Sequence, residues 1–477
     1  MVSGKQGKPK KKLKVLFCAS EVAPFEKTGG LADVAGSLPR ALGLLGAEIL
    51  ILMPKYRNVA VTSKKISANV RIRFVEEERY FNRAGLYGND WGDYPDNLQR
   101  FSFFCHAALD LAKSEGFRPD LVHGHDWQTA LLPVLLKTKF AADPFFKRTK
   151  SILTVHNIAY QGHFPHKQFG SLGLDPSLYS VDGFEFYGKI NLLKAGLLFA
   201  DALTTVSPTY AKEIRTQEYG FGLEGVVKKR AKDLHGILNG LDTKLWDPAV
   251  DKRIPAAYSA ADMSGKRRCK AELQKLCRFE EDPDIPLFAM VTRLAEQKGL
   301  ELVSEVADRF LSSRAQFVLL GEGDGVYHTS FQNIGNRHPK TSRMFLDFDA
   351  VKAHALYAGA DFFLMPSYFE PCGLGQMISM RYGTLPVARR VGGLADTVVD
   401  LEERPEKGNG FLFTEKSPEK LMHTIERAKK FFTDKKKLSM VQKKAMKTDF
   451  SWDKSAETYW KLYNSLLKKS QMQGAKK

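Results

Sequence analysis

The sequence KTGGLADVAGSLPRAL at residues 27–42 decides how the rest of the chain is interpreted. The apolar run VLFCA at residues 15–19 precedes it and is typical of a buried parallel strand. From Leu31 to Leu42, leucine and valine recur every three or four residues, which predicts an amphipathic helix. Two glycines therefore fall at a strand-to-helix junction, where backbone amides and the positive end of the helix dipole favour an anion.

These glycines have two interpretations. Gly29 and Gly30 either only turn the chain, or they form a phosphate cradle to which Lys27 adds a full charge. A second copy, VGGLADT at residues 391–397, lies far away in the sequence. This repetition favours the cradle.

The composition indicates a folded protein with more than one domain. The chain has 477 residues, and at roughly 150 residues per domain we expect two or three domains. No run reaches the roughly 18 apolar residues that cross a bilayer, and the apolar run after the basic start is too short for a signal peptide. Five cysteines lack the spacing of zinc sites or disulfide frameworks. We therefore predict a cytoplasmic protein with no membrane partner.

The net charge of +18 is concentrated at the two ends of the sequence. Residues 1–14 carry +6 and residues 419–477 carry +10, which leaves +2 for residues 15–418. The terminal lysines form either a solvated tail and outer helix faces or a docking patch for a polyanion, and the first interpretation is favoured. We therefore expect no nucleic-acid partner.

Strand-like and helix-like segments alternate along the first half, which predicts a doubly wound parallel sheet. Residues 48–53 form a second expected strand, and the charged residues 61–83 are expected to form hairpins. Residues 100–105 are interpreted as a strand that leads into a helix over residues 107–113.

Histidines follow two further expected strands, at residues 119–122 and 151–155. These strand ends deliver His123, His125, Asp126, His156 and Asn157. In open α/β sheets ligands bind at the carboxyl ends of the strands. The alternative is that the histidines only cap strands through hydrogen bonds, which is favoured for His123. A metal site would need a third ligand at a usual spacing, so no metal is predicted.

The second half repeats the pattern after residues 243–264, a proline-containing segment without periodicity that we expect to be a linker. Expected strands again end in polar or glycine-rich loops. These loops carry Arg293, Lys298, Gly321, Glu370, Cys372, Gly373, Leu374, Gly392, Gly393 and Leu394. The G-x-G turn at Gly321 is by itself weak evidence for a nucleotide. Two Rossmann-like halves would then face each other across a deep cleft.

Seven motifs carry a resemblance to a known family. They are KTGGLADV at residues 27–34, HDW at 125–127, VHNIAYQG at 155–162, NGLD at 239–242, TRLAEQKG at 292–299, FEPCGLGQ at 369–376 and VGGLADTV at 391–398. In this order they resemble bacterial glycogen synthases and plant starch synthases, which are retaining glucosyltransferases of the two-domain GT-B fold. The resemblance extends from Val15 to about Tyr463.

The resemblance implies a domain arrangement. It comprises a basic tail at residues 1–14, an acceptor-side Rossmann-like domain at 15–242, the linker at 243–264, a donor domain at 265–450, and a helix at 451–477 that returns to the first domain. It also implies an ADP-glucose donor and an α-1,4-glucan acceptor that is extended at its non-reducing end. The alternatives are UDP-glucose or a short sugar acceptor on the same fold, and a glucan-binding scaffold without catalysis.

The resemblance also assigns roles to individual residues. Lys27, Arg293 and Lys298 would stabilise the departing diphosphate, helped by backbone amides of the two Gly-Gly turns and without a metal or other cofactor. Glu370 would hold a donor-sugar hydroxyl and favour the developing positive charge, with front-face attack as the family's usual picture. A carboxylate nucleophile is the alternative role for Glu370. His156 would lie near the primary hydroxyl of the sugar.

The implied substrate contacts complete this set. They are Lys27, Gly29, Gly30, Asp33, Asp126, Asn157, Asn239, Gly321, Phe348, Cys372, Gly373, Leu374, Gly392, Gly393 and Leu394. Phe348 would stack on the nucleobase, and Cys372 would serve packing within its motif. Ile378 stands where many broader GT-B transferases carry a second glutamate, which favours the glycogen and starch synthase branch.

Overall fold

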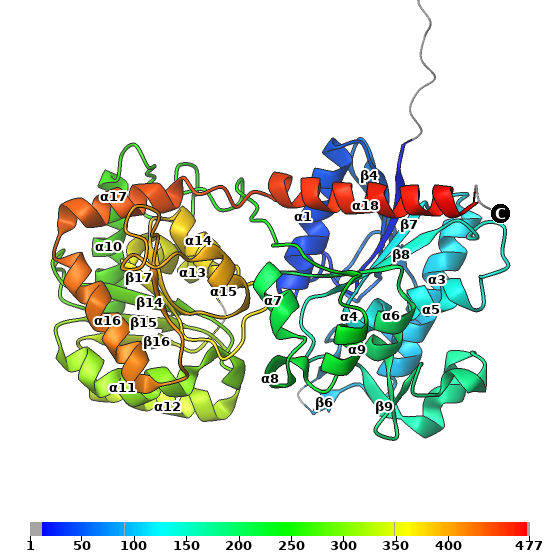
Figure 1. The fold of residues 1–477 in the computed structure, drawn as a ribbon. Coiled ribbons are helices and arrows are strands. Elements are labelled where there is room, and N and C mark those ends of the chain that lie inside the picture. The colour runs from blue at the N-terminus through cyan, green and yellow to red at the C-terminus, as the bar shows by residue number, and fades with distance from the viewer. Residues whose placement is uncertain (1–11, 90, 348, 475–477) are drawn as a thin grey trace, which may run out of the picture. The chain divides into compact units, whose positions relative to one another are not determined.

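The computed structural model describes residues 12–474 except residues 90 and 348, and these form two compact units (Figure 1). The first unit holds the chain up to Val206, Ala211–Gly240, and the chain from Trp452 onward. The second unit holds Ser207–Tyr210 and Leu241–Ser451. Of the tail expected at residues 1–14, only the last three residues are among those described.

The first unit is built on an eight-stranded sheet in the order β13-β12-β8-β7-β1-β2-β4-β3. Its strands are β1 (Lys14–Cys18), β2 (Glu48–Pro54), β3 (Ser63–Ser67), β4 (Val70–Val75), β7 (Leu121–His125), β8 (Lys150–Val155), β12 (Ala202–Thr205) and β13 (Leu234–Gly236). Neighbouring strands are parallel except for the antiparallel pair β3–β4. The winding direction reverses between β1 and β7, which makes this point the switch point of the sheet.

Helices cover both faces of this sheet (Figure 1). They are α1 (Gly30–Leu44), α2 (Glu78–Phe81), α3 (Asn97–Ser114), α4 (Asp126–Thr129), α5 (Leu131–Lys137), α6 (Leu192–Phe199), α8 (Gln217–Gly220), α9 (Glu224–Lys229) and α18 (Trp452–Gly474), while α7 (Pro208–Glu213) spans the unit boundary. A small sheet in the order β10-β11-β9 and a two-stranded sheet lie outside the main one. These smaller elements are β5 (Gly88–Asn89), β6 (Gly92–Asp93), β9 (His163–Pro165), η1 (His166–Leu172), η2 (Pro176–Leu178), β10 (Glu185–Phe186) and β11 (Lys189–Asn191).

The strand predicted at residues 100–105 is wrong, because these residues belong to helix α3. The aromatic run FSFFC has high β propensity, but its buried residues follow helical spacing. Phe101, Phe104, Cys105 and Ala108 are all buried on one face of the helix. Tertiary burial therefore overrides the local propensity.

The last helix, α18, belongs to the first unit although it follows the whole second unit in sequence. It packs along α1 (Figure 1). Tyr463 Oη lies 2.7 Å from Nδ1 of His123 on β7, and both residues are fully buried. A Cβ added to Gly240 would lie 2.6 Å from Cα of Trp452, so the start of α18 is tightly packed as well.

The second unit is built on a parallel sheet in the order β16-β15-β14-β17-β18-β19, with its switch point between β14 and β17. Its strands are β14 (Leu287–Val291), β15 (Gln316–Leu320), β16 (Ser342–Phe345), β17 (Phe362–Met365), β18 (Leu385–Arg389) and β19 (Phe411–Phe413). Its helices are α10 (Ser264–Cys277), η3 (Glu296–Lys298), α11 (Leu300–Ser312), α12 (Gly325–Arg337), α13 (Ala350–Gly359), α14 (Gly375–Arg381), α15 (Gly392–Thr397), α16 (Pro418–Phe432) and α17 (Lys435–Met446).

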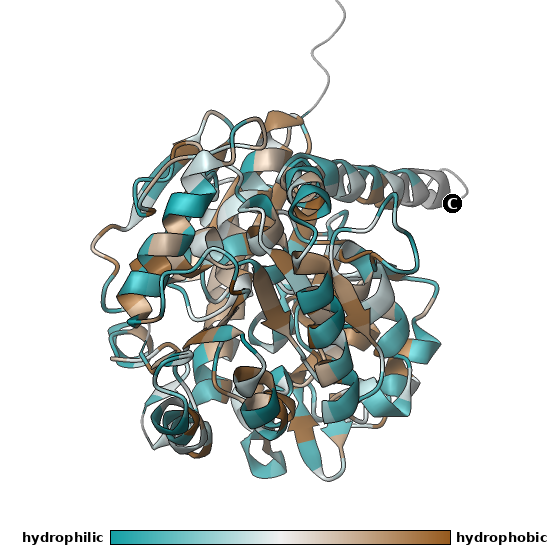
Figure 2. Cartoon of the chain, turned by 90° about the vertical axis from the view of Figure 1, so that its left-hand side faces the viewer, coloured by the Kyte–Doolittle hydropathy of each residue, from teal (hydrophilic) through white to brown (hydrophobic). Residues whose placement is uncertain are grey.

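Two hydrophobic cores lie on opposite faces of the second sheet. Phe288 and Met290 of β14 join one core, and Leu287 and Ala289 join the other, as the two-residue period of a strand requires. Figure 2 shows these hydrophobic strands flanked by helices of mixed hydropathy. Residues 243–264 pack within this unit, where Tyr258 Oη donates to the carbonyl of Tyr382 at 2.8 Å.

Among the described residues, no helix is both long and apolar enough to cross a membrane.

Candidate functional site

Several of the predicted site residues follow the two strands that flank the switch point of each sheet. In the first unit, the loop with Lys27 follows β1 and Asp126 follows β7. In the second unit, the loop with Lys298 follows β14 and Glu370 follows β17. Each unit therefore carries one group of candidate residues at the carboxyl edge where such sheets bind ligands.

The loop with Lys27 is held in place by Glu21, a residue that the sequence analysis missed. Oε2 of Glu21 accepts hydrogen bonds from the amides of Thr28 at 2.5 Å and Gly29 at 3.3 Å. Tyr87 Oη donates to the other carboxylate oxygen at 3.3 Å. Burial raises the pKa of Glu21, and the hydrogen bonds from Thr28, Gly29 and Tyr87 oppose this rise. Glu21 follows a strand end, and this position could have identified it.

Gly29 leaves an open space above the loop. Its φ of −154° is accessible to any residue, and a Cβ built there would meet no atom within 4 Å. The fold therefore does not require glycine at this position, whereas a ligand that approaches the backbone closely would require it. Gly30 is exposed and begins helix α1.

Lys27 is half exposed and forms an ion pair with Asp33 in the first turn of α1. Its Nζ lies 2.7 and 2.8 Å from the two carboxylate oxygens of Asp33. Asp33 thus lies beside the glycine loop as expected and orients the ammonium group. The exposed pair contributes little to stability.

Asp126 and His156 lie at the ends of the adjacent strands β7 and β8. Asp126 has a φ of +55°, which is strained for a residue with a side chain. Its Oδ1 accepts a hydrogen bond from the amide of His156 at 2.6 Å. Burial raises the pKa of Asp126 to about 7, and the charge of Glu21 adds to the rise. The carboxyl group thus titrates near neutral pH.

Three neutral histidines lie behind Asp126. His125 Nδ1 is 3.0 Å from His156 Nε2, and His123 Nε2 is 2.6 Å from Thr154 Oγ1. Burial lowers the pKa of His156 and of His123 to about 3, and it lowers the pKa of His125 well below its ordinary value. The full burial of His123 and its bonds to Thr154 and Tyr463 agree with the structural role favoured for it.

Asn157 and Asn239 also belong to the first unit. Oδ1 of Asn157 accepts from the amide of Ala159 at 3.0 Å, which closes the turn after β8. Asn239 is buried, and among the described residues its Oδ1 has no hydrogen-bond partner.

In the second unit, a buried ion pair joins Glu370 and Lys298. Nζ of Lys298 lies 2.7 Å from Oε2 of Glu370, with the two side chains 15% and 7% exposed. Ser367 Oγ donates to the same carboxylate oxygen at 3.0 Å. Ser367 is buried and was also missed by the sequence analysis. The carboxylate is therefore fixed by two donors in a largely dry environment.

Arg293 lies on the same loop as Lys298. It is exposed, and no other described residue forms a hydrogen bond or ion pair with its side chain. The loop packs closely on its neighbours, since a Cβ at Gly321 would lie 2.0 Å from the carbonyl oxygen of Thr292. Arg389, a further residue missed from sequence, donates to the carbonyl of Tyr368 at 2.7 Å and supports the Glu370 loop.

The second Gly-Gly turn supports Glu370 through backbone contacts. The amide of Gly393 donates to the carbonyl of Glu370 at 3.0 Å, and the amide of Leu394 donates to Val391 at 2.9 Å. A Cβ at Gly392, where φ is +42°, would lie 2.0 Å from the carbonyl oxygen of Glu370. In this structure the amides of Gly393 and Leu394 thus donate to backbone carbonyls, and their binding of phosphate stays a prediction. Close packing explains both glycines.

The remaining donor-side residues follow Glu370 in sequence. Cys372 is buried, and its carbonyl accepts from Nε2 of Gln376 at 3.0 Å, which agrees with a packing role. Gly373 has a φ of +70°, and Leu374 precedes the first residue of α14. Phe348 lies outside the described residues.

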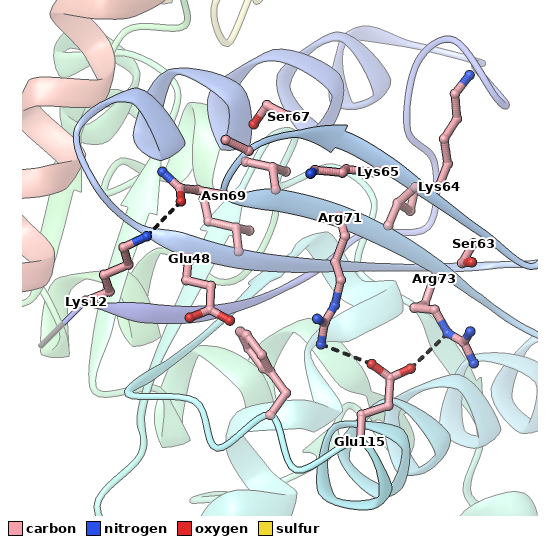
Figure 3. Close-up of a pocket in the computed structure, with 15 residues that line it drawn as sticks. Lys12, Glu48, Ser63, Lys64, Lys65, Ser67, Asn69, Arg71, Arg73 and Glu115 are labelled. Atoms are coloured by element: carbon pink, nitrogen blue, oxygen red, sulfur yellow. Dashed lines mark hydrogen bonds and ion pairs between the residues drawn. The ribbon is translucent and has the colours of Figure 1, made fainter.

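A pocket of about 550 Å³ occurs elsewhere on the first unit (Figure 3). Its lining includes Lys12, Lys65, Arg71 and Arg73, and both arginines converge on Glu115 at 3.2 and 2.9 Å. The pocket lies beside the amino ends of β1, β2 and β4, opposite to the ligand-binding edge, and contains none of the predicted site residues. Lys64 and Lys65 lie on the edge strand β3, where charged side chains disfavour pairing with another chain.

The described residues contain no group of three or more His, Cys, Asp or Glu side chains that could hold a metal ion.

Two family descriptions match the chain in succession. Residues 14–229 match the starch synthase catalytic domain, and residues 277–448 match the glycosyl transferases group 1. Two Rossmann-like units with these matches define a two-domain α/β glycosyltransferase of the GT-B type.

Relatives that align with nearly the full length of this chain identify its family within this class of glycosyltransferases. The chain is 43% identical to a glycogen synthase of Syntrophotalea carbinolica, with 95% of this chain and 99% of the relative covered. It is 45% identical to glycogen synthase 2 of Geobacter sulfurreducens, with 94% and 98% covered. The chain therefore belongs to the glycogen synthase and starch synthase family of glucosyltransferases.

Solved structures agree with this assignment. The catalytic domain of starch synthase IV from Arabidopsis thaliana, bound to ADP and acarbose, matches with a TM-score of 0.89 and 34% identity, covering 96% of this chain and all of that one. A sucrose-phosphate synthase from Thermosynechococcus elongatus matches with a TM-score of 0.63 and 19% identity, covering 95% and 99%. The second likeness concerns the fold alone.

Proposed function

We propose that the chain transfers glucose from ADP-glucose to the non-reducing end of an α-1,4-glucan in the cytoplasm, with retention of the anomeric configuration and without a metal ion or other cofactor. The observation that carries the proposal is the buried ion pair between Glu370 and Lys298 at the switch point of the second unit, with the exposed Arg293 on the same loop as Lys298. The similar starch synthase IV structure is bound to ADP, which supports an adenine nucleotide as the leaving group.

The charges of this site suit the departure of a diphosphate. As the bond to the sugar breaks, negative charge grows on the diphosphate and positive charge grows on the sugar ring. Arg293 and Lys298 are cations that would stabilise the negative charge on the diphosphate, and the Glu370 carboxylate is an anion that would stabilise the positive charge on the sugar ring. Lys27, oriented by Asp33, would add a further cation from the first unit.

The geometry of Glu370 favours front-face attack over double displacement. Oε2 already accepts from Lys298 and Ser367, and these donors reduce the nucleophilicity of the carboxylate. In front-face attack the acceptor hydroxyl gives its proton to the departing phosphate, and Glu370 stabilises charge without forming a bond. The Asp126 carboxyl group and the His156 ring would contact the sugars.

The test is nucleotide release from ADP-glucose and from UDP-glucose, each with and without glycogen, together with incorporation of labelled glucose into precipitated glucan. We expect release only with ADP-glucose and glycogen together, unchanged by EDTA. A preference for UDP-glucose would refute the donor, equal rates with glucose as acceptor would refute the glucan, and loss of activity in EDTA that Mg²⁺ restores would refute metal independence.

A further inference from the structure

The tip of the β10–β11 hairpin carries a tyrosine in a backbone conformation that disfavours it. The two-residue turn Tyr187–Gly188 joins the strands, with φ of +49° and +74°. Two positive φ values are typical of type I′ turns, which favour Asn-Gly or Gly-Gly because other side chains are strained at the first position. Tyr187 is nevertheless found there, 83% exposed. Its ring meets the ring of Phe186 at an edge, with centroids 4.7 Å apart, but most of its surface is exposed.

Phe221 shows the same combination of strain and exposure. It follows the last residue of α8 with a φ of +50°, at a position where glycine is usual, and it is 42% exposed. Among the described residues, the non-glycine residues with positive φ in the first unit are Asp126, Tyr187 and Phe221. Strained backbone concentrates at functional sites, and Asp126 already belongs to the candidate site.

The segments that carry these two rings are in contact. A Cβ added to Gly222, next to Phe221, would lie 3.0 Å from Cζ of Phe186, next to Tyr187. The ring of Phe186 in turn stacks on His163 of β9 with centroids 5.4 Å apart. In Figure 1, β9 and α8 both lie at the lower end of the first unit.

A third exposed ring connects this region to the candidate site. Tyr160 is 54% exposed and lies four residues after His156. The neighbouring Gln161 donates from Nε2 to the carbonyl of Phe221 at 2.9 Å, which ties the two segments together. The loop that begins at His156 thus leads directly to the exposed aromatic rings.

We propose that Tyr160, Tyr187 and Phe221 form an aromatic platform on which glucose rings of the acceptor glucan stack, at a distance from the transferred sugar. Pyranose rings present apolar C–H faces, and exposed aromatic rings are the complementary surface for an uncharged sugar polymer. The strain at Tyr187 and Phe221 is then retained because glucan binding needs these rings. The proposal rests on the proposed function, since it names the surface that holds the acceptor.

The experiment compares the intact enzyme with Tyr187→Asn, which provides the favoured Asn-Gly turn while removing the ring. For this variant we expect the KM for glycogen to rise about fivefold, as for the loss of one aromatic contact, with kcat and the KM for ADP-glucose within twofold. We also expect weaker retention on native gels that contain glycogen, and a melting temperature that is unchanged or higher because strain is removed. A purely structural tyrosine would instead lower the melting temperature.

Further variants sharpen the test. Phe221→Gly is expected to behave like Tyr187→Asn, and Tyr187→Phe keeps the ring and is expected to restore retention. Leu44→Ala changes an exposed apolar residue of the same unit and serves as the control. Wild-type glycogen KM and retention in both ring-deleting variants would overturn the platform, as would a lower melting temperature with unchanged retention. Because retention needs no transfer, a wild-type chain that binds glycogen but ignores ADP-glucose would refute only the proposed function.

Discussion

Replacing Glu370 separates its electrostatic role from its structural role. Glu370→Gln keeps the shape of the side chain and an acceptor for Lys298 and Ser367 but removes the negative charge. We expect kcat to fall by roughly 10²- to 10³-fold, the range found when one preorganised electrostatic group is lost. Affinity for ADP should change little, because the carboxylate acts on the sugar.

The effect on stability follows from the burial of the ion pair. In Glu370→Ala, Lys298 is left without its partner at 15% exposure. Breaking a buried pair in this way costs about 3–5 kcal/mol. At about 2–4 °C per kcal/mol for a unit of this size, the melting temperature should fall by roughly 6–20 °C. Glu370→Ala combined with Lys298→Met leaves no buried charge unpaired, so we expect the double variant to be more stable than Glu370→Ala alone.

The assays are steady-state nucleotide release, calorimetric titration with ADP, and thermal unfolding followed by circular dichroism. Glu305→Gln, at an exposed glutamate on α11 of the same unit, is the matched control and should resemble the wild type in all three. Near-normal turnover in Glu370→Gln would remove Glu370 from the chemistry. Strictly additive effects of the two changes on the melting temperature would show that the pair has no energetic coupling.

Three further predictions concern the Gly-Gly turns of the two units, Lys27, and Asp126. Gly29→Ala should raise the KM for ADP-glucose but leave the melting temperature near that of the wild type, because a Cβ at Gly29 meets no other atom. Gly393→Ala should lower the melting temperature by several degrees, because its Cβ would lie 2.0 Å from the carbonyl oxygen of Cys372. Equal melting temperatures of the two variants would contradict this contrast. Lys27→Ala should lower kcat as well as donor affinity, and a change in affinity alone would argue against a role in the transition state. Between about pH 4 and 6.5, His123, His125 and His156 bind protons only in the unfolded state, so the free energy of unfolding decreases as the pH is lowered. Asp126 binds a proton only in the folded state over this range and offsets part of the loss. Asp126→Asn removes this offset, so its melting temperature should fall more steeply on acidification, and equal slopes would refute the raised pKa.

Local patterns were sufficient for most of the parallel strands, because a strand buried on both faces is a short apolar run bounded by polar residues. Residues 48–53 illustrate this, since the predicted strand lies within β2. The same argument failed at residues 100–105, where a wide buried helix face imitates an apolar strand. A longer window would have shown the spacing from Leu98 to Ala112.

The residues that position the site were harder to find from sequence. Glu21 accepts from Thr28, seven residues later, and Ser367 donates to Glu370, three residues later, within irregular loops whose path no repeating residue pattern predicts. Likewise, the two Gly-Gly motifs look alike in sequence but differ in space. A Cβ at Gly29 meets nothing, whereas Gly392 and Gly393 lie against the backbone of the Glu370 loop. No pattern of residue types distinguishes an open glycine from a packed one.

The place of α18 in the first unit has a consequence for how the chain is made. The ribosome synthesises residues 241–451, the bulk of the second unit, before it reaches α18. At about 5–20 residues per second, the earlier part of the first unit waits roughly 10–40 s for the helix that covers α1 and supplies Tyr463 to His123. Apart from Ser207–Tyr210, the second unit is one continuous segment that ends at Ser451, so all of its residues are synthesised before α18. The first unit, by contrast, carries an uncovered apolar face on α1 until α18 is made.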